Sequence, residues 1–257
     1  RLRLDDGSIS NSHQREVSVL QLWRRDAHHY LIRVDRHVVI VAGGKGSRMR
    51  SELPKQFLLL LEVPILMHTV ERFVHAFEDI NIIVVLPSDQ VKAWENLCLQ
   101  MDFDIPHKVV AGGETRYASV TNGLNSCEGS GVVAIHDGVR PLLSPGFIQK
   151  CMNHAEKNGS AIPVLPIKQS LRMVEESGSS AIDRKGIHTV QTPQCFHLDE
   201  LKSCYAQDYN PTFTDDATVY EAAGKSVSLV EGEESNLKIT TPIDIKIAQT
   251  ILKKSKR

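Results

Sequence analysis

The sequence has few features of a secreted or membrane protein. Its five cysteines are an odd number, and no two of them form a Cys-x-x-Cys pair. Such usage is typical of reduced thiols in a cytoplasmic protein rather than of a disulfide framework. The longest apolar runs, such as residues 57–61 and 82–86, are far shorter than the roughly 20 residues that span a bilayer. We therefore expect a cytoplasmic protein that does not enter a membrane.

An excess of charge of one sign is also missing. The chain has 30 Lys and Arg residues against 31 Asp and Glu residues, which gives a formal net charge of −1. A protein that attracts nucleic acid through its overall field needs an excess of basic residues. We therefore expect no nucleic-acid partner, and any anion site must be a local pocket.

Several common nucleotide and metal motifs are absent as well. The phosphate-loop spacing Gly-x4-Gly-Lys-Ser/Thr occurs nowhere, and the dinucleotide fingerprint that begins at Gly44-x-Gly46 would need a third small residue where Met49 stands. The eleven histidines show no spacing typical of zinc ligands. These absences disfavour a general phosphate-loop protein, a dinucleotide-binding protein and a zinc protein.

The chain divides into two unequal parts. Residues 1–36 lack sustained apolar periodicity and mix arginines with acidic residues, so we predict an N-terminal extension that is disordered or weakly docked. Residues 37–257 are long enough, and apolar enough, to form one α/β domain with a sizeable core.

From His37 onward, strand-like and helix-like patterns alternate. The apolar runs at 38–42, 80–86, 108–111, 132–135, 161–167 and 226–230 are mostly continuous, as in strands that are covered on both faces. Helical patterns occupy 65–77, 88–101, 115–126, 145–157, 198–207, 215–223 and 243–253. This alternation predicts a doubly wound, mostly parallel sheet of Rossmann-like type, which binds ligands beyond the carboxyl ends of its strands.

The first strand runs into a glycine turn that is flanked by cations. The segment reads Ala42-Gly43-Gly44-Lys45-Gly46-Ser47-Arg48-Met49, and Pro54-Lys55-Gln56 follows. Glycines let backbone N–H groups approach an anion without interference from a Cβ atom. Arg48 and Lys55 are placed to neutralise charge that develops on a phosphorus centre. The segment predicts a site for a nucleoside triphosphate.

Polar clusters follow other predicted strands. They are Gly112-Gly113-Glu114-Thr115-Arg116 with Ser119, His136-Asp137-Gly138-Val139-Arg140-Pro141, and the segment 236–241. The glycine pair could be only a tight turn, and we interpret His136 as a packed or hydrogen-bonded residue rather than a base. Asp137 and Arg140 could be a simple ion pair, but their place at a strand end favours a functional role.

Five separated motifs, in order, carry a family resemblance. They are the glycine turn with Pro54-Lys55-Gln56, residues 112–120, residues 136–141, Thr192-Pro193-Gln194, and residues 230–240. With them, residues 37 to about 252 resemble the 2-C-methyl-D-erythritol 4-phosphate cytidylyltransferases of the non-mevalonate isoprenoid pathway. The resemblance implies a nucleotidyltransferase fold and the transfer of CMP from CTP to methylerythritol phosphate, giving CDP-methylerythritol and pyrophosphate.

The resemblance also implies roles for individual residues. Arg48, Lys55 and Lys238 would be catalytic cations. The residues expected to bind CTP are Ala42, Gly43, Gly44, Gly46, Gly112, Gly113, Glu114 and Ser119. The residues expected to bind the acceptor are Asp137, Arg140, Ser170, Arg184 and Thr192. A divalent cation, Mg²⁺, would be held mainly by the phosphates of CTP.

A homodimer is a further implication, in which residues 168–190 form an arm that brings Ser170 and Arg184 to the partner's site. The residues of the arm support a projecting hairpin, because β-type residues flank a charged centre that contains Gly and Ser at 175–180. The chain has Gln169-Ser170 where the family typically has an acidic residue and Thr; Ser keeps the hydroxyl, whereas Gln lacks the charge.

The expected chemistry needs no conspicuous base. A phosphate monoester has a second pKa of about 6, so it is largely dianionic at neutral pH and can attack a phosphorus atom directly. Catalysis then consists of positioning and charge neutralisation.

Three other functions are open on the sequence. A ribitol-5-phosphate cytidylyltransferase would share the CTP half and much of the acceptor half of the site, so only the polyol pocket separates it. A sugar-nucleotide pyrophosphorylase would share the glycine turn, Arg and Pro-Lys, but not the motifs at 137–141 and 192–194. A catalytically silent nucleotide-binding regulator would be expected to have lost at least one of the cations Arg48, Lys55, Arg140 and Lys238, all of which are present.

Overall fold

The computed structural model describes residues 34–44 and 53–255, and those from Asp35 onward belong to one compact unit. The predicted extension therefore lies outside the described residues, except for Val34 to Arg36. Arg36 is already the first residue of β1. Gly46 and Arg48 of the glycine turn also lie outside the described residues.

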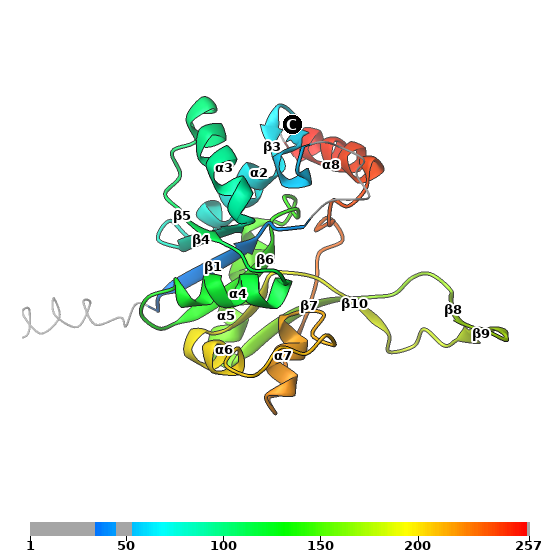
Figure 1. Cartoon of the computed structure of the whole chain (residues 1–257). Helices are drawn as coiled ribbons and strands as arrows, with labels where there is room; N and C mark the ends of the chain where they lie inside the picture. The colour runs from blue at the N-terminus through cyan, green and yellow to red at the C-terminus, as the bar shows by residue number, and fades with distance from the viewer. Residues whose placement is uncertain (1–33, 45–52, 256–257) are drawn as a thin grey trace, which may run out of the picture. The chain divides into compact units, whose positions relative to one another are not determined.

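A mostly parallel sheet of eight strands forms the centre of the fold, as predicted (Figure 1). Its order is β10-β7-β11-β6-β1-β4-β5, with β12 also paired to β7. The bounds are β1 Arg36–Val41, β4 Asn81–Leu86, β5 Lys108–Ala111, β6 Val132–Asp137, β7 Ser160–Pro166, β10 His188–Val190, β11 Gln194–His197 and β12 Leu229–Glu231. The strands β6, β1, β4 and β5 are parallel neighbours, so their carboxyl ends lie at one edge.

Seven α-helices and one short 3-10 helix accompany the described strands. They are η2 Lys55–Phe57, α2 Ile65–Ala76, α3 Ser88–Gln100, α4 Arg116–Asn125, α5 Pro145–Asn158, α6 Leu198–Cys204, α7 Asp216–Ala222 and α8 Pro242–Ser255. Each α-helix overlaps a helical pattern in the sequence. The predicted helix positions are therefore confirmed.

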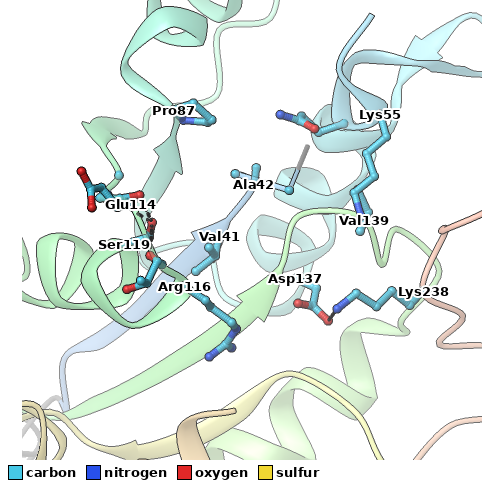
Figure 2. Close-up of a pocket in the computed structure, with 16 residues that line it drawn as sticks. Val41, Ala42, Lys55, Pro87, Glu114, Arg116, Ser119, Asp137, Val139 and Lys238 are labelled. Carbon is cyan, nitrogen blue, oxygen red and sulfur yellow. Dashed lines mark hydrogen bonds and ion pairs between the residues drawn. The ribbon is translucent and has the colours of Figure 1, made fainter. Parts of the chain in front are cut away.

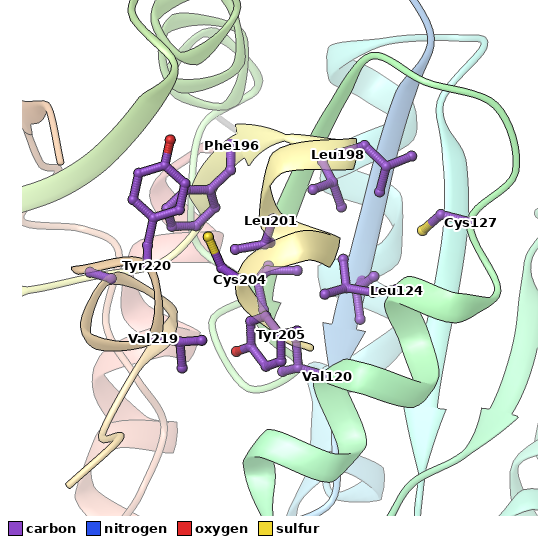
Figure 3. Packing of buried hydrophobic residues seen from close by; sticks show 14 of the residues in the cluster. Val120, Leu124, Cys127, Phe196, Leu198, Leu201, Cys204, Tyr205, Val219 and Tyr220 are labelled. Atoms are coloured by element: carbon purple, nitrogen blue, oxygen red, sulfur yellow. The ribbon is translucent and has the colours of Figure 1, made fainter. Parts of the chain in front are cut away.

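One core layer lies between the sheet and the helices α4, α6 and α7. Side chains of α4 and α6, such as Val120, Leu124 and Leu201, meet Val39 and Val133 of the strands (Figure 3). The Tyr117 hydroxyl of α4 also donates to the Tyr205 carbonyl oxygen over 2.9 Å, at the end of α6. Burial of this apolar surface fixes α4, whose N-terminal end borders the site described below.

Two further helices pack against each other. Gln149 of α5 donates from Nε2 to the carbonyl oxygen of Ala76, the last residue of α2, over 2.7 Å. The ring of Phe73 of α2 meets the ring of His136 of β6 edge-on, with centroids 5.1 Å apart. The strand that carries Asp137 is thus fixed by this packing as well as by its backbone hydrogen bonds to β1 and β11.

The strands β10 and β11 were not predicted from the sequence. Strand β11 reads Gln-Cys-Phe-His and runs antiparallel between β6 and β7. It is too short, and too mixed in polarity, to produce either a continuous apolar run or a clear alternation. The short hairpin of β2 (Leu59–Leu60) and β3 (Val63–Pro64) was missed for the same reason.

The predicted hairpin in the arm is confirmed. Among the described residues, strands β8 (Leu171–Glu175) and β9 (Gly178–Ile182) pair only with each other, and they extend away from the sheet (Figure 1). Strand β10 then leads the chain from the arm back to β7.

Candidate active site

A cavity of about 260 Å³ lies at the carboxyl ends of the parallel strands (Figure 2). The ends of the four central strands and the loops after them contribute to its lining: residues 41–44 at the end of β1, Pro87 after β4, residues 112–116 after β5, and Asp137 and Val139 at the end of β6. Lys55, Gln56, Ser119 and Lys238 complete the lining. The position is where a sheet of this type binds its ligand.

The glycine turn after β1 forms one wall of this cavity. The Ala42 N–H donates to the Val85 carbonyl oxygen over 2.9 Å, which ties the turn to β4. Among the described residues, a Cβ atom at Gly43 would meet only Pro87, at an ordinary 3.8 Å, whereas a Cβ at Gly44 would lie 3.2 Å from Cε of Lys55. Packing against the described residues therefore does not require glycine at 43, and the space that they leave there can receive a ligand.

Gly112 and Gly113 are required by packing and not by backbone conformation. Neither has a positive φ angle. A Cβ atom would lie 2.8 Å from Ser119 Oγ at position 112, and 2.5 Å from Ala118 Cβ at position 113. The two glycines thus let the first turn of α4 approach β5 closely. They therefore do more than form a tight turn, which was the simpler alternative in the sequence.

The N-terminal end of α4 faces the cavity. Thr115 caps the helix by accepting a hydrogen bond from the Ala118 N–H over 3.0 Å. Ser119 Oγ accepts from the Gly113 N–H over 3.2 Å and donates to the Thr115 carbonyl oxygen over 2.9 Å. These bonds fix Ser119 and the loop of residues 112–115 in place at this wall of the cavity.

Asp137 lies opposite, at the end of β6, between two cations. Its Oδ2 atom is 2.8 Å from Arg140 Nε. The same atom is 3.1 Å from Lys238 Nζ (Figure 2). Burial alone would raise the pKa of Asp137, but Lys238, Arg140 and Arg116 outweigh burial and hold the pKa well below its ordinary value. The carboxylate is therefore ionised at any physiological pH.

His136 is buried and neutral, as the sequence analysis expected. It has no exposed surface, and burial lowers its pKa to about 3. Nε2 lies 3.3 Å from the Arg140 carbonyl oxygen, and Nδ1 lies 3.0 Å from Thr192 Oγ1. Both nitrogens are engaged within the protein, so His136 does not serve as a base at the cavity.

Comparisons with known proteins agree with this geometry. The sequence profile of 2-C-methyl-D-erythritol 4-phosphate cytidylyltransferase, IspD, matches residues 36–254. This chain belongs to the IspD family. A relative of that name from Bacteroides fragilis is 50% identical over 217 residues, which are 84% of this chain and 99% of the relative. One from Bacteroides thetaiotaomicron is 46% identical over 215 residues, which are 84% of this chain and 98% of the relative.

The fold is also shared with solved structures. The crystal structure of 4-diphosphocytidyl-2C-methyl-D-erythritol synthase from Anaerococcus prevotii superposes with a TM-score of 0.72 at 27% identity, covering 86% of this chain and 96% of the other. The predicted nucleotidyltransferase fold and the family resemblance are therefore confirmed.

Most IspD motif residues that the sequence singled out meet at the cavity. The expected CTP-binding residues among its lining are Ala42, Gly43, Gly44, Gly112, Gly113, Glu114 and Ser119, and Lys55, Asp137 and Lys238 line it too. Arg140 and Thr192 are buried behind Asp137. The expected roles of Gly46 and Arg48 fall outside the described residues.

Ser170 and Arg184 are not part of this cavity. Both are exposed at the base of the arm, where Arg184 Nη1 donates to the carbonyl oxygen of Lys168. Met173 and Val174 of β8 are also exposed. Within one chain, therefore, the expected acceptor residues are divided between the cavity and the arm.

Arg116 lines the cavity but was not among the predicted site residues. Its two terminal nitrogens lie 2.9 and 2.6 Å from the carboxylate oxygens of Asp216, which is fully buried and also accepts from the Tyr205 hydroxyl over 2.6 Å. The signal for Arg116 was present, because it belongs to the motif that begins at Gly112. Nothing in the sequence indicated Asp216, which lies 100 residues away.

The described part of the chain offers no ready-made metal cage and no membrane helix. No group of three or more His, Cys, Asp or Glu side chains is arranged to hold an ion there. None of its helices combines the length and the apolar character needed to cross a bilayer.

The packing at Gly113 gives a test of the cavity wall. We expect Gly113→Ala to lower the free energy of unfolding by about 1–3 kcal/mol, because the new methyl group would overlap Ala118 and push α4 away. Chemical denaturation measures this change. The matched control is Gly146→Ala in α5, where a Cβ atom meets no atom of the described residues within 4 Å; it should raise stability by up to about 1 kcal/mol, since Ala is the better helix former. Equal effects of the two substitutions would contradict the close packing at Gly113.

Proposed function

We propose that this chain transfers CMP from CTP to 2-C-methyl-D-erythritol 4-phosphate, forming CDP-methylerythritol and pyrophosphate for isoprenoid precursor synthesis. The observation that carries the proposal is the meeting of four separated IspD motifs in one cavity. The N-terminal end of α4 lines one side of that cavity, and Lys55 and Lys238 line other parts of it.

CTP occupies the wall formed by the loops after β1 and β5. Its cytidine lies by Gly112, Gly113, Glu114 and Ser119, and its triphosphate lies along Ala42 to Gly44 and beside Lys55. From the family motif, Gly46 and Arg48 are expected to complete the binding of the triphosphate. The open space at Gly43 and the cationic side chain beside Gly44 support this orientation, because both suit phosphate oxygens that approach the backbone.

The acceptor occupies the end of the cavity at Asp137 and Lys238, with Arg140 and Thr192 behind. Lys238 neutralises the acceptor phosphate as that phosphate approaches the α-phosphorus of CTP. The phosphate is its own nucleophile, since it is already dianionic near neutral pH. The engaged and neutral state of His136 supports a mechanism without an enzymatic base.

Lys55 and Arg48 act mainly on the transition state. Negative charge crowds on the α-phosphoryl oxygens as the new bond forms and the bond to pyrophosphate breaks. Fixed cations beside that position stabilise it more than they stabilise bound CTP.

We also propose Mg²⁺ as the cofactor. Glu114 and Asp137 are the carboxylates in the described lining, and Asp137 is already paired with two cations. This donor set fits an ion that takes its ligands largely from substrate phosphates, as Mg²⁺ commonly does. When bound, Mg²⁺ would supply charge neutralisation for the departing pyrophosphate.

A homodimer in the cytoplasm is the expected state of the protein. The exposed apolar residues of β8 support a partner surface for the arm, since an isolated two-stranded hairpin is only marginally stable. All five cysteines are unpaired, which fits a reducing compartment.

The decisive assay measures pyrophosphate release with each of the four nucleoside triphosphates, crossed with methylerythritol phosphate and ribitol phosphate. The proposal predicts turnover with CTP and methylerythritol phosphate. Faster turnover with ribitol phosphate would show that ribitol phosphate, rather than methylerythritol phosphate, is the acceptor. Tight CTP binding without turnover on either acceptor would indicate a silent nucleotide-binding regulator.

Lys55→Ala should lower kcat by about a hundredfold, or about 3 kcal/mol in the barrier, while CTP affinity changes much less. The reason is that the charge beside Lys55 grows mainly in the transition state. Initial rates over a range of CTP concentrations separate the two effects. Lys92→Ala removes an exposed lysine of α3 and serves as the control. An unchanged kcat with only a raised KM for CTP would show that Lys55 merely binds substrate.

Subunit mixing tests whether Arg184 completes the partner's site. Arg184→Ala and Lys55→Ala homodimers should each have low activity, and mixing them should restore activity by subunit exchange. If each site uses the partner's arm, one site of the mixed dimer carries both changes and the other site is intact. An inactive mixed dimer, verified by mass, would place Arg184 in the site of its own chain.

A further inference from the structure

A chain of hydrogen bonds with a fixed direction lies directly behind Asp137. It joins the backbone of β6 to Thr192, in the link between β10 and β11, and to the buried ring of His136. The donor–acceptor distances are 3.1 Å from Asp137 N to Thr192 Oγ1, 3.0 Å from Thr192 Oγ1 to His136 Nδ1, and 3.3 Å from His136 Nε2 to the Arg140 carbonyl oxygen.

The direction of each bond follows from the chemistry of its atoms. A carbonyl oxygen can only accept, so His136 Nε2 must carry the ring hydrogen. In a neutral ring, Nδ1 is then a bare acceptor and must receive the hydrogen of the Thr192 hydroxyl. The Asp137 N–H can only donate, so it points to the oxygen of that same hydroxyl. Every group in the chain is satisfied in one arrangement.

This arrangement commits the single hydrogen of the Thr192 hydroxyl. Thr192 is buried, and its backbone carbonyl oxygen accepts from Asn236 Nδ2 over 2.8 Å, which holds the residue from the other side. A phosphate oxygen needs a hydrogen-bond donor, and this hydroxyl has no hydrogen left to give. Thr192 therefore does not donate a hydrogen bond to an acceptor phosphate while this hydrogen-bond relay from Asp137 through Thr192 and His136 to Arg140 is intact.

We propose that His136 and Thr192 are positioning residues that set the place of Asp137 and Arg140, and so the acceptor end of the cavity. This inference rests on the proposed function. The relay holds the turn of residues 137–140 at both ends, through the Asp137 N–H and the Arg140 carbonyl oxygen. Because Asp137 in turn pairs with Lys238, a shift of this turn moves the cation that meets the acceptor.

Kinetics of four variants test the relay. Thr192→Val keeps the volume and removes the hydroxyl, and His136→Phe keeps the ring contact with Phe73 and removes both nitrogens. Each should raise KM for methylerythritol phosphate by about 10- to 100-fold and leave KM for CTP nearly unchanged, since each leaves buried polar groups unpaired. Thr192→Ser should restore most of the affinity. Thr121→Val is the control, because its hydroxyl bonds only within α4.

The double variant separates the relay from direct contact. If both residues act through one chain of bonds, Thr192→Val combined with His136→Phe should cost about as much as either change alone. If Thr192 instead donates directly to the acceptor, His136→Phe should free the hydroxyl and leave the acceptor KM unchanged. That result, or equal shifts in both KM values, would overturn the proposal.

The ring of His136 gives a readout on the unmodified protein that does not depend on activity. Long-range proton–nitrogen NMR, assigned by comparison with His136→Phe, should show hydrogen on Nε2 and a bare Nδ1. Hydrogen on Nδ1 would overturn the relay even if the enzyme is active. If the unmodified protein shows the expected tautomer but no turnover of CTP, the proposed function is wrong and the relay is still supported.

Discussion

The pairing of Asp137 with Arg140 and Lys238 is the interaction on which the site depends. A carboxylate so little exposed loses much of its hydration, and the two cations at 2.8 and 3.1 Å offset that loss. Arg140 makes a second contact, in which Nη1 donates to the Asn236 carbonyl oxygen over 2.9 Å. The end of β6 is thereby joined to a segment almost 100 residues later, and Lys238 is held at the cavity before a ligand arrives.

The charge of the cavity is local, as the near-neutral composition requires. Lys55, Lys238 and Arg116 line it together with the N-terminal end of α4. Arg116 is held in place by the buried carboxylate of Asp216 and contributes to the low pKa of Asp137. Cations that are fixed before the substrate binds need little reorganisation during the reaction, which is the main way such a site accelerates phosphoryl transfer.

The sequence predicted much of this arrangement because motifs and strand ends are local features. Continuous apolar runs located the parallel strands, and parallel strands bring their carboxyl ends to one edge; this is why Gly43, Gly113 and Asp137 were expected to meet. The short antiparallel strand β11 has no such pattern. Its position between β6 and β7 comes from pairing with strands far away in the chain.

Contacts between distant residues account for what the sequence could not predict. His136 and Thr192 were both noticed, but their bond spans 56 residues and no spacing rule indicates it. The same holds for Arg116 and Asp216. The arm was recognised from its composition and from the family resemblance, but no contact within the described residues shows what receives it, so its role at a partner's site stays a prediction.

The central claim is that the acceptor phosphate itself attacks the α-phosphorus of CTP in this cation-lined cavity. Methylerythritol phosphate labelled with ¹⁸O on its phosphate oxygens tests it most directly, by ³¹P NMR and mass spectrometry of the products. The account predicts that the label is fully retained in CDP-methylerythritol, with one labelled oxygen bridging the two phosphorus atoms, and that pyrophosphate carries none. Loss of label to water, or its appearance in pyrophosphate, would contradict the account.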